Sequence, residues 1–445
     1  MAHAVKGKKN RKYVVSVKKR TNAVKKTIQE HAHEIPVAGE YDVVICGGGP
    51  AGVAAAIASA RAGASTILIE SQGCLGGTWT SGCLSWILDH SNKPGLMKEI
   101  LERLELLNGR AIHDGVRTNA FDIEKMKLLL ETLCIESGVE IRLYTFLVGT
   151  VCSGSRLTHA ITESKSGRQA FAGKVFIDCT GDGDLAARAG CGFDMGHPET
   201  GATQPMTLLA LVAGIEPEAV RPFFRYAGET AKVEVCERLR KEMERGGHSS
   251  SHAMPGLFWI CEDLFGLAAN HEYGVRGTDT ADLTHATIDA RKEIHSLVNA
   301  LRSLGGVWGR LHLVATASQI GVREGRRIHG QYMITIDDMT RGVRYPDAVC
   351  TVTFPIDVHA TDPVTGKTFL NDPSSVQKIQ PYDIPLRALI ARDVDGLMMA
   401  GRCISGDFLS HASYRVTGNA VAMGEAAGRV AARTASEGHC YQLKA

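Results

Sequence analysis

Three glycines and one carboxylate near the start of the chain have the spacing of a nucleotide-binding turn. Gly47, Gly49 and Gly52 form a Gly-x-Gly-x-x-Gly motif, and Glu70 follows 18 residues after the last glycine. The first glycine permits a tight turn, the second lets the backbone approach a pyrophosphate, and the third allows close packing of a helix against a strand. A carboxylate at this distance can accept hydrogen bonds from ribose hydroxyls. The pattern indicates the binding of a dinucleotide.

The elements around these residues are those that the motif needs. Residues 41–46 are a short apolar run typical of a buried strand, residues 53–62 are an alanine-rich helix without a breaker, and residues 65–70 are a second strand. The N-terminus of the helix then faces the phosphates, where its partial positive charge favours an anion. We therefore expect a βαβ unit within an α/β fold.

Three further segments place small and polar residues at predicted strand ends. A glycine pair and a threonine at 76–78 follow the acidic residue, and a Thr-Gly-Asp turn at 180–182 follows the strand from 174. A Gly-Arg pair at 401–402 follows an apolar strand from 395, and a helix of small residues is predicted over 416–436. A glycine pair after the acid would let the chain pass close to a ribityl chain and an isoalloxazine ring, which favours FAD over NAD.

In these segments the chain resembles the glutathione-reductase-like FAD flavoproteins. More narrowly, it resembles the FAD-dependent oxidoreductases that are distantly related to the flavin subunit of heterodisulfide reductase. The resemblance covers about residues 35–437 and rests on the ordered motifs GGGPAGVAAA, ESQGCLGGT, DCTGDGDLAARAG, QPMTL, GVREGRRIHGQYMIT, YDIPLRAL and AGRCIS…HASYRV…AMGEAAG. It implies bound FAD without a separate NAD(P)H domain. The motifs and the resemblance together predict that FAD is bound by Gly47, Gly49, Pro50, Ala51, Gly52, Glu70, Gly76, Gly77, Thr78, Thr180, Gly181, Asp182, Gly401, Arg402, Thr417, Gly418 and Asn419.

The catalytic candidates are His411 and Arg415. They are four residues apart, and Asn419 follows after four more, so a turn or helix would project all three side chains the same way. A histidine exchanges a proton near pH 7, and an arginine binds a carboxylate or a developing anion. The stretch resembles the His…Arg-x-x-Gly-Asn run of the fumarate reductase and succinate dehydrogenase flavoproteins, which implies that both side chains face substrate. The alternative is that both brace the pyrimidine edge of the flavin.

Residues 79–90 are the expected wall of the substrate pocket, because they directly follow the glycine pair. Their polar members include Asp89 and His90, which are the next candidates for an acid–base group. Core or surface positions are an equal alternative for these polar side chains.

The cysteines indicate chemistry without a dithiol. Flavin disulfide reductases carry a Cys-x-x-x-x-Cys pair after the glycine turn, whereas here Trp79 follows the turn and only Cys83 comes later. A lone redox thiol at Cys83 and a covalent flavin anchor at Cys74 stay open, but inert packing is favoured for both. No two cysteines form Cys-x-x-Cys, so neither a zinc ribbon nor an iron–sulfur cluster is predicted, and the pattern is that of a reduced, cytoplasmic protein.

No metal site is predicted from the histidines. Several of them fall between residues 248 and 295 without a regular ligand spacing, which favours exposed or core positions over a metal centre. These histidines are His248, His252, His271, His285 and His295.

Composition and charge exclude several classes of protein. Of the 445 residues, 44% are hydrophobic and 22% charged, which excludes bulk disorder, and no run of 18 apolar residues could span a membrane. Residues 1–29 hold ten Lys or Arg and no acid, so the rest has 40 basic against 48 acidic residues, a net charge of −8. A mildly acidic body argues against nucleic acid as a partner. The basic segment is interpreted as a solvated extension, with a binding arm or a targeting segment as alternatives.

The predicted organisation has one fold with an insertion. Residues 1–35 are the basic extension, 36–190 the first part of the FAD domain, 191–395 an inserted α+β substrate or cap domain, 396–437 the rest of the FAD domain and 438–445 a tail. The predicted function is hydride transfer between a small organic substrate and flavin N5, with an electron acceptor that no motif identifies and a homo-oligomer left open. An electron-transfer subunit and an RNA-modifying flavoprotein are the alternatives, disfavoured by the missing iron–sulfur cysteines and by the acidic body.

Overall fold

The computed structural model describes residues 27–113, 115–224, 232–361 and 378–438. The chain forms two units, residues 1–35 and residues 36–445. In the first unit the described residues 27–35 contain neither a helix nor a strand. Most of the basic segment lies outside the described residues, so its predicted role as a dispensable extension stays a prediction.

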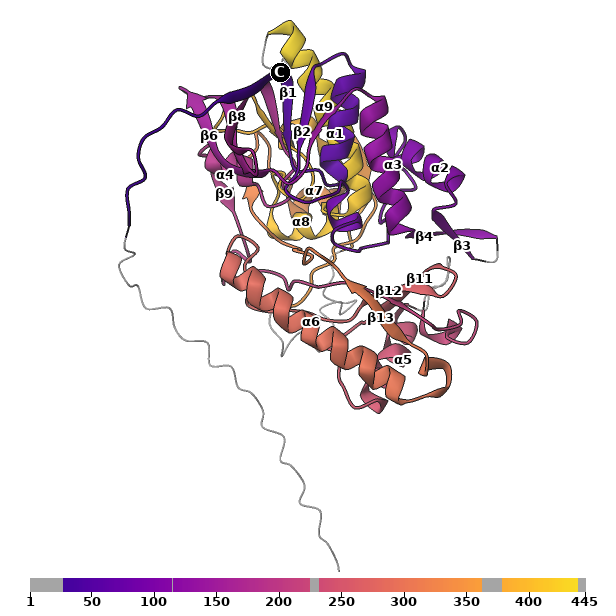
Figure 1. The fold of residues 1–445 in the computed structure, drawn as a ribbon. Helices are drawn as coiled ribbons and strands as arrows, with labels where there is room; N and C mark the ends of the chain where they lie inside the picture. The colour runs from indigo at the N-terminus through magenta and orange to yellow at the C-terminus, as the bar shows by residue number, and fades with distance from the viewer. Residues whose placement is uncertain (1–26, 114, 225–231, 362–377, 439–445) are drawn as a thin grey trace, which may run out of the picture. The chain divides into compact units, whose positions relative to one another are not determined.

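A seven-stranded sheet with a parallel centre organises the second unit (Figure 1). Its order is β5-β2-β1-β8-β7-β6, and β17 also pairs with β8. β1, β2, β5, β8 and β17 pair in parallel, whereas β6, β7 and the first half of β8 form an antiparallel meander. This confirms the predicted α/β fold. The strands are β1 (Val37–Cys46), β2 (Thr66–Ile69), β5 (Glu140–Arg142), β6 (Phe146–Ser153), β7 (Arg156–Ser164), β8 (Gly167–Asp178) and β17 (Leu397–Met399).

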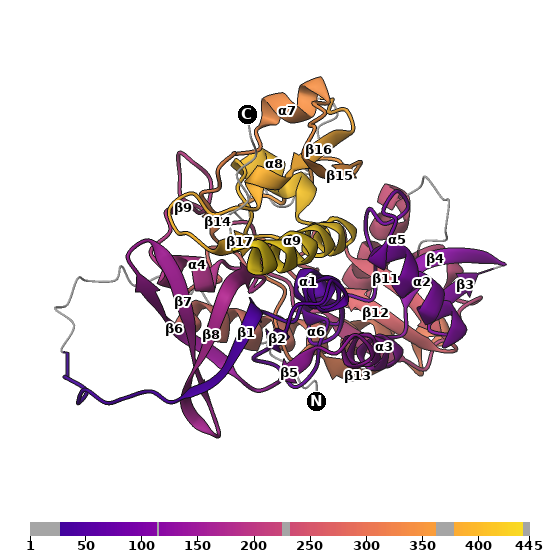
Figure 2. The same ribbon diagram turned by 90° about the horizontal axis from the view of Figure 1, so that it is seen from above.

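Two helices of small residues pack side by side against this sheet (Figure 2). They are α1 (Pro50–Arg61) and α9 (Thr417–Glu437), which the sequence predicted at nearly these bounds. The backbones approach so closely that an added Cβ on Gly424 would lie 2.0 Å from the carbonyl oxygen of Ala51. The long helix α9 therefore brings the end of the chain back to the first βαβ unit.

Three further helices belong to the larger sheet's half of the unit. α3 (Ile123–Glu136) begins at the N-cap Asp122, whose side chain accepts hydrogen bonds from the N–H groups of Glu124 and Lys125. α2 (Leu96–Leu106) ends shortly before strand β3 begins at Arg110. α4 (Asp184–Arg188) follows β8 directly.

A second, antiparallel sheet has its own hydrophobic cluster. Its order is β11-β12-β10-β13, and α6 packs against β13 and α5 (Figure 1). Phe265 and Trp308 are fully buried in this cluster, which is distinct from that of the larger sheet. The domain boundaries proposed from the sequence stay a prediction. The elements are β10 (Ala210–Ala213), α5 (Lys232–Arg245), β11 (Gly256–Cys261), β12 (Leu264–Ala268), α6 (Thr280–Ser303) and β13 (His312–Thr316).

Several short strands and helices lie in the segments outside the two larger sheets. Three two-stranded sheets pair β3 with β4, β9 with β14 and β15 with β16, and two short helices lie near the C-terminus. In the described part of the chain, no helix is both long and apolar enough to cross a membrane. The elements are β3 (Arg110–His113), β4 (Val116–Phe121), β9 (Phe193–Asp194), β14 (Arg327–Ile328), α7 (Ile336–Arg341), β15 (Ala348–Val352), β16 (Tyr382–Pro385) and α8 (Phe408–Tyr414).

Candidate functional site

A cavity of about 530 Å³ opens at the carboxyl ends of the parallel strands. Four parallel strands end at this cavity, namely β1 at Cys46, β2 at Ile69, β8 at Asp178 and β17 at Met399. The residue that directly follows each of these strand ends lines the cavity. Open parallel sheets bind ligands at this edge, where the connections leave the sheet in different directions. We call this the strand-end cavity.

The glycine turn between β1 and α1 forms one wall of the strand-end cavity. Gly47 has φ +101°, and an added Cβ would lie 2.3 Å from the carbonyl oxygen of Cys179, so a side chain cannot be accommodated. A Cβ on Gly52 would lie 1.7 Å from the carbonyl oxygen of Gly47, which is the close packing that the motif predicts. Gly49 differs from both, because an added Cβ there meets no atom within 4 Å.

Helix α1 starts at this turn with an uncapped N-terminus. Gly49 is the N-cap, Pro50 is the first helical residue, and no side chain caps the helix. Gly49, Pro50 and Ala51 all line the strand-end cavity. The partial positive charge of the helix end and its unused N–H groups suit a phosphate group.

Glu70 joins the glycine turn to the end of β2. Its Oε2 accepts a hydrogen bond from the N–H of Gly48 at 2.5 Å, and its Oε1 accepts one from the N–H of Gln72 at 2.7 Å. Oε1 also accepts from the hydroxyl of Ser71 at 3.0 Å, so the remaining acceptor capacity of the carboxylate lies on Oε2. Glu70 also lines the strand-end cavity, so it can accept from a ribose while it holds the turn.

Two acidic residues at the carboxyl end of β8 have different partners. Asp178 is buried and accepts hydrogen bonds from the N–H and hydroxyl of Thr180 and from the N–H of Ala186. Burial raises the pKa of Asp178 to about 6, although these hydrogen bonds oppose the shift. Burial also raises the pKa of Asp182, against the effect of the Arg402 guanidinium 2.9 Å from its carboxylate. Asp182 and Arg402 thus form an ion pair across the cavity wall.

The strand-end cavity gathers most of the predicted cofactor residues. Those that line it are Gly47, Gly49, Pro50, Ala51, Glu70, Gly77, Thr78, Thr180, Gly181, Asp182, Gly401, Arg402 and Thr417. Those that do not line it are Gly52, Gly76, Gly418 and Asn419. Gly418 donates its N–H to the carbonyl of Leu88, so this donor at the start of α9 is already used within the chain.

The three side chains that were predicted to project the same way do not all reach the strand-end cavity. α8 ends at Tyr414 and α9 begins at Thr417, so the helical path is interrupted between them. Arg415 lines the strand-end cavity, but His411 and Asn419 do not. His411 is fully buried, and neither ring nitrogen has a hydrogen-bond partner among the described residues. Burial, with Arg415 nearby, lowers the pKa of His411 well below its ordinary value.

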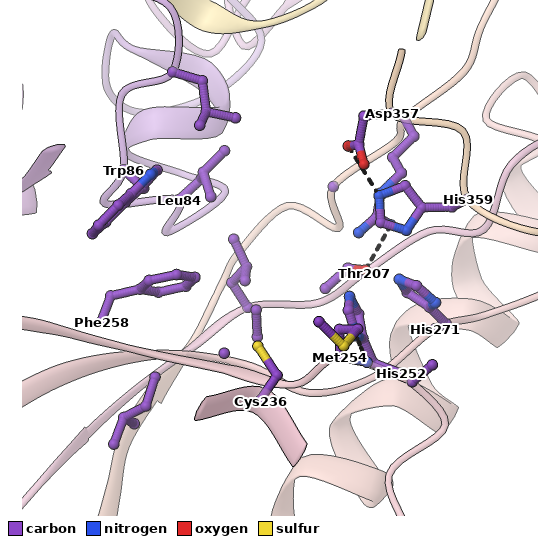
Figure 3. A pocket seen from close by; sticks show the side chains of 18 of the residues that line it. Leu84, Trp86, Thr207, Cys236, His252, Met254, Phe258, His271, Asp357 and His359 are labelled. Atoms are coloured by element: carbon purple, nitrogen blue, oxygen red, sulfur yellow. Dashed lines mark hydrogen bonds and ion pairs between the residues drawn. The ribbon is translucent and has the colours of Figure 1, made fainter. Parts of the chain in front are cut away.

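A second cavity of about 300 Å³ adjoins the first, and its lining is mostly apolar (Figure 3). Trp86 and Phe258 lie at one side with their ring centroids 5.3 Å apart. We call this the apolar cavity. From the predicted wall at 79–90 only three side chains line it, Leu84, Trp86 and Leu88. Asp89 and His90 line neither cavity, because Asp89 pairs with Lys93 and His90 with Asn119.

Histidines from three separate segments meet at the other side of the apolar cavity (Figure 3). The ring nitrogens available from His252, His271 and His359 lie within 4.8 Å of one another. His252 and His271 were predicted to be exposed or core residues because their spacing is irregular, and His359, which follows β15 far along the chain, was not among the candidates. No spacing rule joins the three, because only the fold brings them together.

The cysteines considered for redox chemistry lie outside both cavities. Cys83 packs between the two hydrophobic clusters, and burial raises the pKa of its thiol to about 11. Cys74 lies 3.3 Å from the hydroxyl of Ser81. Neither residue lines the strand-end cavity, so the packing interpretation is favoured for both.

The residues present in the strand-end cavity fit FAD. The open space above Gly49 and the uncapped start of α1 suit a pyrophosphate, and Glu70 suits an adenosine ribose. Arg402 and Thr417 line the same cavity beyond the carboxyl end of β17, where they would hold the flavin part of the molecule.

Comparison with known proteins gives one match over nearly the whole chain. Residues 42–443 match the profile of a family described as FAD dependent oxidoreductase. Two curated proteins match short stretches. The dihydrolipoyl dehydrogenase of Trypanosoma brucei brucei is 48% identical over 50 residues, and the mitochondrial dihydrolipoyl dehydrogenase of Schizosaccharomyces pombe is 51% identical over 47 residues. These stretches are 11% and 10% of this chain, and they span 10% and 9% of the two relatives.

Solved structures with a similar fold have low sequence identity. A geranylgeranyl bacteriochlorophyll reductase-like protein from Thermoplasma acidophilum is 12% identical with a TM-score of 0.43, over 90% of this chain and 78% of that chain. A triple mutant of the flavin-dependent brominase Bmp2 is 14% identical with a TM-score of 0.45, over 89% of this chain and 80% of that chain.

Proposed function

The chain belongs to the FAD dependent oxidoreductase family, and from this premise we propose that it transfers a hydride between flavin N5 and a small organic substrate held in the apolar cavity. The cofactor is FAD, which supplies the redox chemistry when it is bound. The chain's own residues then have three tasks, namely to bind the substrate, to orient it and to move a proton.

One observation carries this proposal. The two cavities share the side chains of five residues, so a molecule in the apolar cavity reaches the wall of the cavity that fits FAD. The shared residues are Leu84, Leu88, Arg323, Asp357 and His359. An apolar pocket with a few polar groups where it meets a cofactor site is the usual form of a substrate site.

His359 is the proposed acid–base group. Its Nε2 lies 3.2 Å from Oδ2 of Asp357. An imidazole that donates Nε2–H to this carboxylate keeps a lone pair on Nδ1 and can accept a proton there. Burial, with Arg323 nearby, lowers the pKa of His359 to about 4, so the ring is neutral and able to accept a proton at pH 7.

Arg415 is proposed as a positioning residue. Its guanidinium donates to the carbonyl oxygens of Arg323 at 3.1 Å and Asp357 at 2.7 Å, and to the side chain of Gln204 at 3.2 Å. These bonds fix the two segments that carry the shared polar residues. The sequence-based assignment of acid–base chemistry to His411 stays a prediction, and its buried position favours His359 for that task.

Anaerobic flavin reduction tests the proposal. A panel of polyols, amines and organic acids is screened for bleaching of the flavin absorbance, and the active compound is used in stopped-flow experiments. His359→Gln should retain FAD and reduce it ~10²–10⁴-fold more slowly, the usual contribution of general acid–base catalysis. His159→Gln, on β7 outside both cavities, is the matched control.

Two outcomes would overturn the assignment. If His359→Gln reduces the flavin at the wild-type rate, His359 moves no proton. If His411→Gln retains FAD and shows the larger slowing, the acid–base group is His411. Failure of every compound in the panel to bleach the flavin would contradict hydride transfer from these classes of small molecule.

A further inference from the structure

We propose that the polar side of the apolar cavity binds the carboxylate of an amphipathic organic acid, whose apolar part lies against the Trp86–Phe258 pair. The polar side consists of His252, His271, Tyr273, Arg323, Asp357 and His359. The inference deepens the proposed function, since it takes this acid to be the class of molecule that meets the flavin.

Charge is unbalanced at this side of the cavity. Among the residues that the structure describes, two guanidinium groups, those of Arg323 and Arg415, lie beside the carboxylate of Asp357, which is 3.9 Å from Arg415. Glu324 directly follows Arg323 in the sequence, but its carboxylate is paired with the guanidinium of Arg327 at 2.6 Å. Buried charges are normally paired, so one further anion would complete this group.

Arg323 has donors to spare toward the cavity. One terminal nitrogen donates to the carbonyl of Pro205 and to the hydroxyl of Thr207, each at 2.7 Å. Its other nitrogens have no hydrogen-bond acceptor among the residues that the structure describes. The remaining edge of the guanidinium can therefore bind a carboxylate through two parallel hydrogen bonds, the geometry that arginine favours.

The histidines add uncharged polar atoms around the same point. Nδ1 of His252 accepts the N–H of Met254 at 2.9 Å, so the proton of this ring lies on Nε2. His271 is 7% exposed, and its buried Nε2 has no hydrogen-bond partner within the part of the chain that the structure describes. Burial lowers the pKa of His271, and that of His359 to about 4, so these rings are neutral at pH 7. The positive charge at this side of the cavity comes from the guanidinium groups. Arg323 keeps its charge at pH 7, because its pKa is lowered only to about 10.

A metal ion is the competing occupant of three clustered histidines. A zinc site would need each ring to present a lone pair ~2.0–2.1 Å from the metal. His252 cannot do so through Nε2 while its Nδ1 accepts the N–H of Met254, because Nε2 then carries the proton. Two neighbouring guanidinium groups would also repel a cation. Both facts favour an anion.

The size and lining of the cavity define the rest of the ligand. About 300 Å³ corresponds to roughly ten groups of water size, at ~30 Å³ each. The apolar end is formed by the Trp86–Phe258 pair (Figure 3), and the side chains of Leu209, Met254 and Leu257 add further apolar lining. A monocarboxylic acid with a medium alkyl chain or one aromatic ring matches this combination.

Calorimetric titration of the FAD-loaded protein with octanoate and octan-1-ol tests the inference. The two probes share their chain and differ in charge. We expect octanoate to bind about 10- to 100-fold more tightly, as a charged hydrogen-bond pair of roughly 1.5–3 kcal/mol would produce. Arg323→Gln should abolish this preference and leave the affinity for octan-1-ol unchanged. Arg433→Gln, which removes an exposed guanidinium of α9, is the control and should alter neither affinity.

Each alternative result overturns the inference. Equal binding of the two probes to the wild-type protein would mean that the cavity recognises only the chain, and this measurement does not depend on the folding of a variant. An undiminished preference in Arg323→Gln would place the anion elsewhere. One equivalent of a divalent metal in the purified protein, lost in His271→Ala, would assign the histidines to that ion. Binding is measured without turnover, so a retained octanoate preference with no flavin reduction by any acid would contradict the proposed function alone.

Discussion

The strand-end cavity and the apolar cavity share part of a wall, yet they are built in different ways. The first is formed mainly by backbone turns at strand ends, with Gly47 and Gly49 in one short motif and Gly401 after the last parallel strand. The second is formed by side chains from segments that lie far apart in the sequence, such as Trp86, Phe258 and His359. A backbone-built site depends on residue types at fixed spacing, whereas a side-chain-built site depends on where separate segments meet.

This difference predicts how each cavity tolerates change. A side chain added to the strand-end cavity competes directly with the cofactor, because the space in this cavity is left by residues that have no side chain. A side chain removed from the apolar cavity alters affinity and rate while the cofactor site keeps its shape. The following predictions run from the largest expected effect to the smallest.

Gly49→Val should abolish FAD binding while the fold is retained. An added Cβ at Gly49 meets no protein atom within 4 Å, so the valine fits the protein and occupies the space of the pyrophosphate. Absorbance of the purified protein and circular dichroism measure the two effects separately. Gly149→Val is the control, because a Cβ on this strand residue makes ordinary contacts at 3.5 Å outside the cavity. A yellow Gly49→Val protein with normal flavin content would contradict the role of this wall.

Two buried groups, His359 in the shared wall of the cavities and Asp178 at the end of β8, should change the stability with pH in opposite directions. His359 has a pKa lowered to about 4 from an ordinary 6.5, so the stability that it contributes is present above pH 6.5 and is lost as the pH falls toward 4. Asp178 has a pKa raised to about 6 from 3.8, so the stability that it contributes is present below pH 3.8 and is lost as the pH rises through 6.

Urea unfolding at pH 7 and pH 5 measures this contrast. Between pH 7 and pH 5, the unfolding free energy of His359→Gln should fall by about 2 kcal/mol less than that of the wild type. The unfolding free energy of Asp178→Asn should fall by about 1 kcal/mol more than that of the wild type. Each variant serves as the control for the other, since their deviations have opposite directions. Identical pH responses in all three proteins would show that neither group changes its protonation on unfolding in this range.

Cys83→Ser should have the smallest effect, with flavin content and turnover near those of the wild type. Burial raises the pKa of this thiol to about 11, and the residue lines neither cavity. A thiol with so little thiolate at neutral pH is a poor nucleophile. Cys261→Ser, at an exposed position, is the control. Loss of turnover in Cys83→Ser with flavin content and folding intact would restore a thiol mechanism.

The sequence by itself determined the cofactor half of this protein. The turn at Gly47–Gly52, the acid at Glu70 and the helix cap at Asp122 follow from local rules, because strand, turn and helix signals lie within a few residues of one another. The strand ends at Thr180 and Gly401 could be predicted for the same reason. In this half, the hydrogen bond from the N–H of Gly418 to the carbonyl of Leu88 could be found only from the tertiary structure.

Only the tertiary structure decided which residues share the second cavity. His411 and Arg415 keep their helical spacing, since Arg415 is the C-cap of α8, but the packing around α8 buries the histidine and leaves the arginine at a cavity wall. His252, His271 and His359 have no mutual spacing, yet they meet because the antiparallel sheet carries two of them to the loop after β15 that carries the third. Contacts between distant segments are set by the packing of whole layers, and no local pattern of residues records that packing.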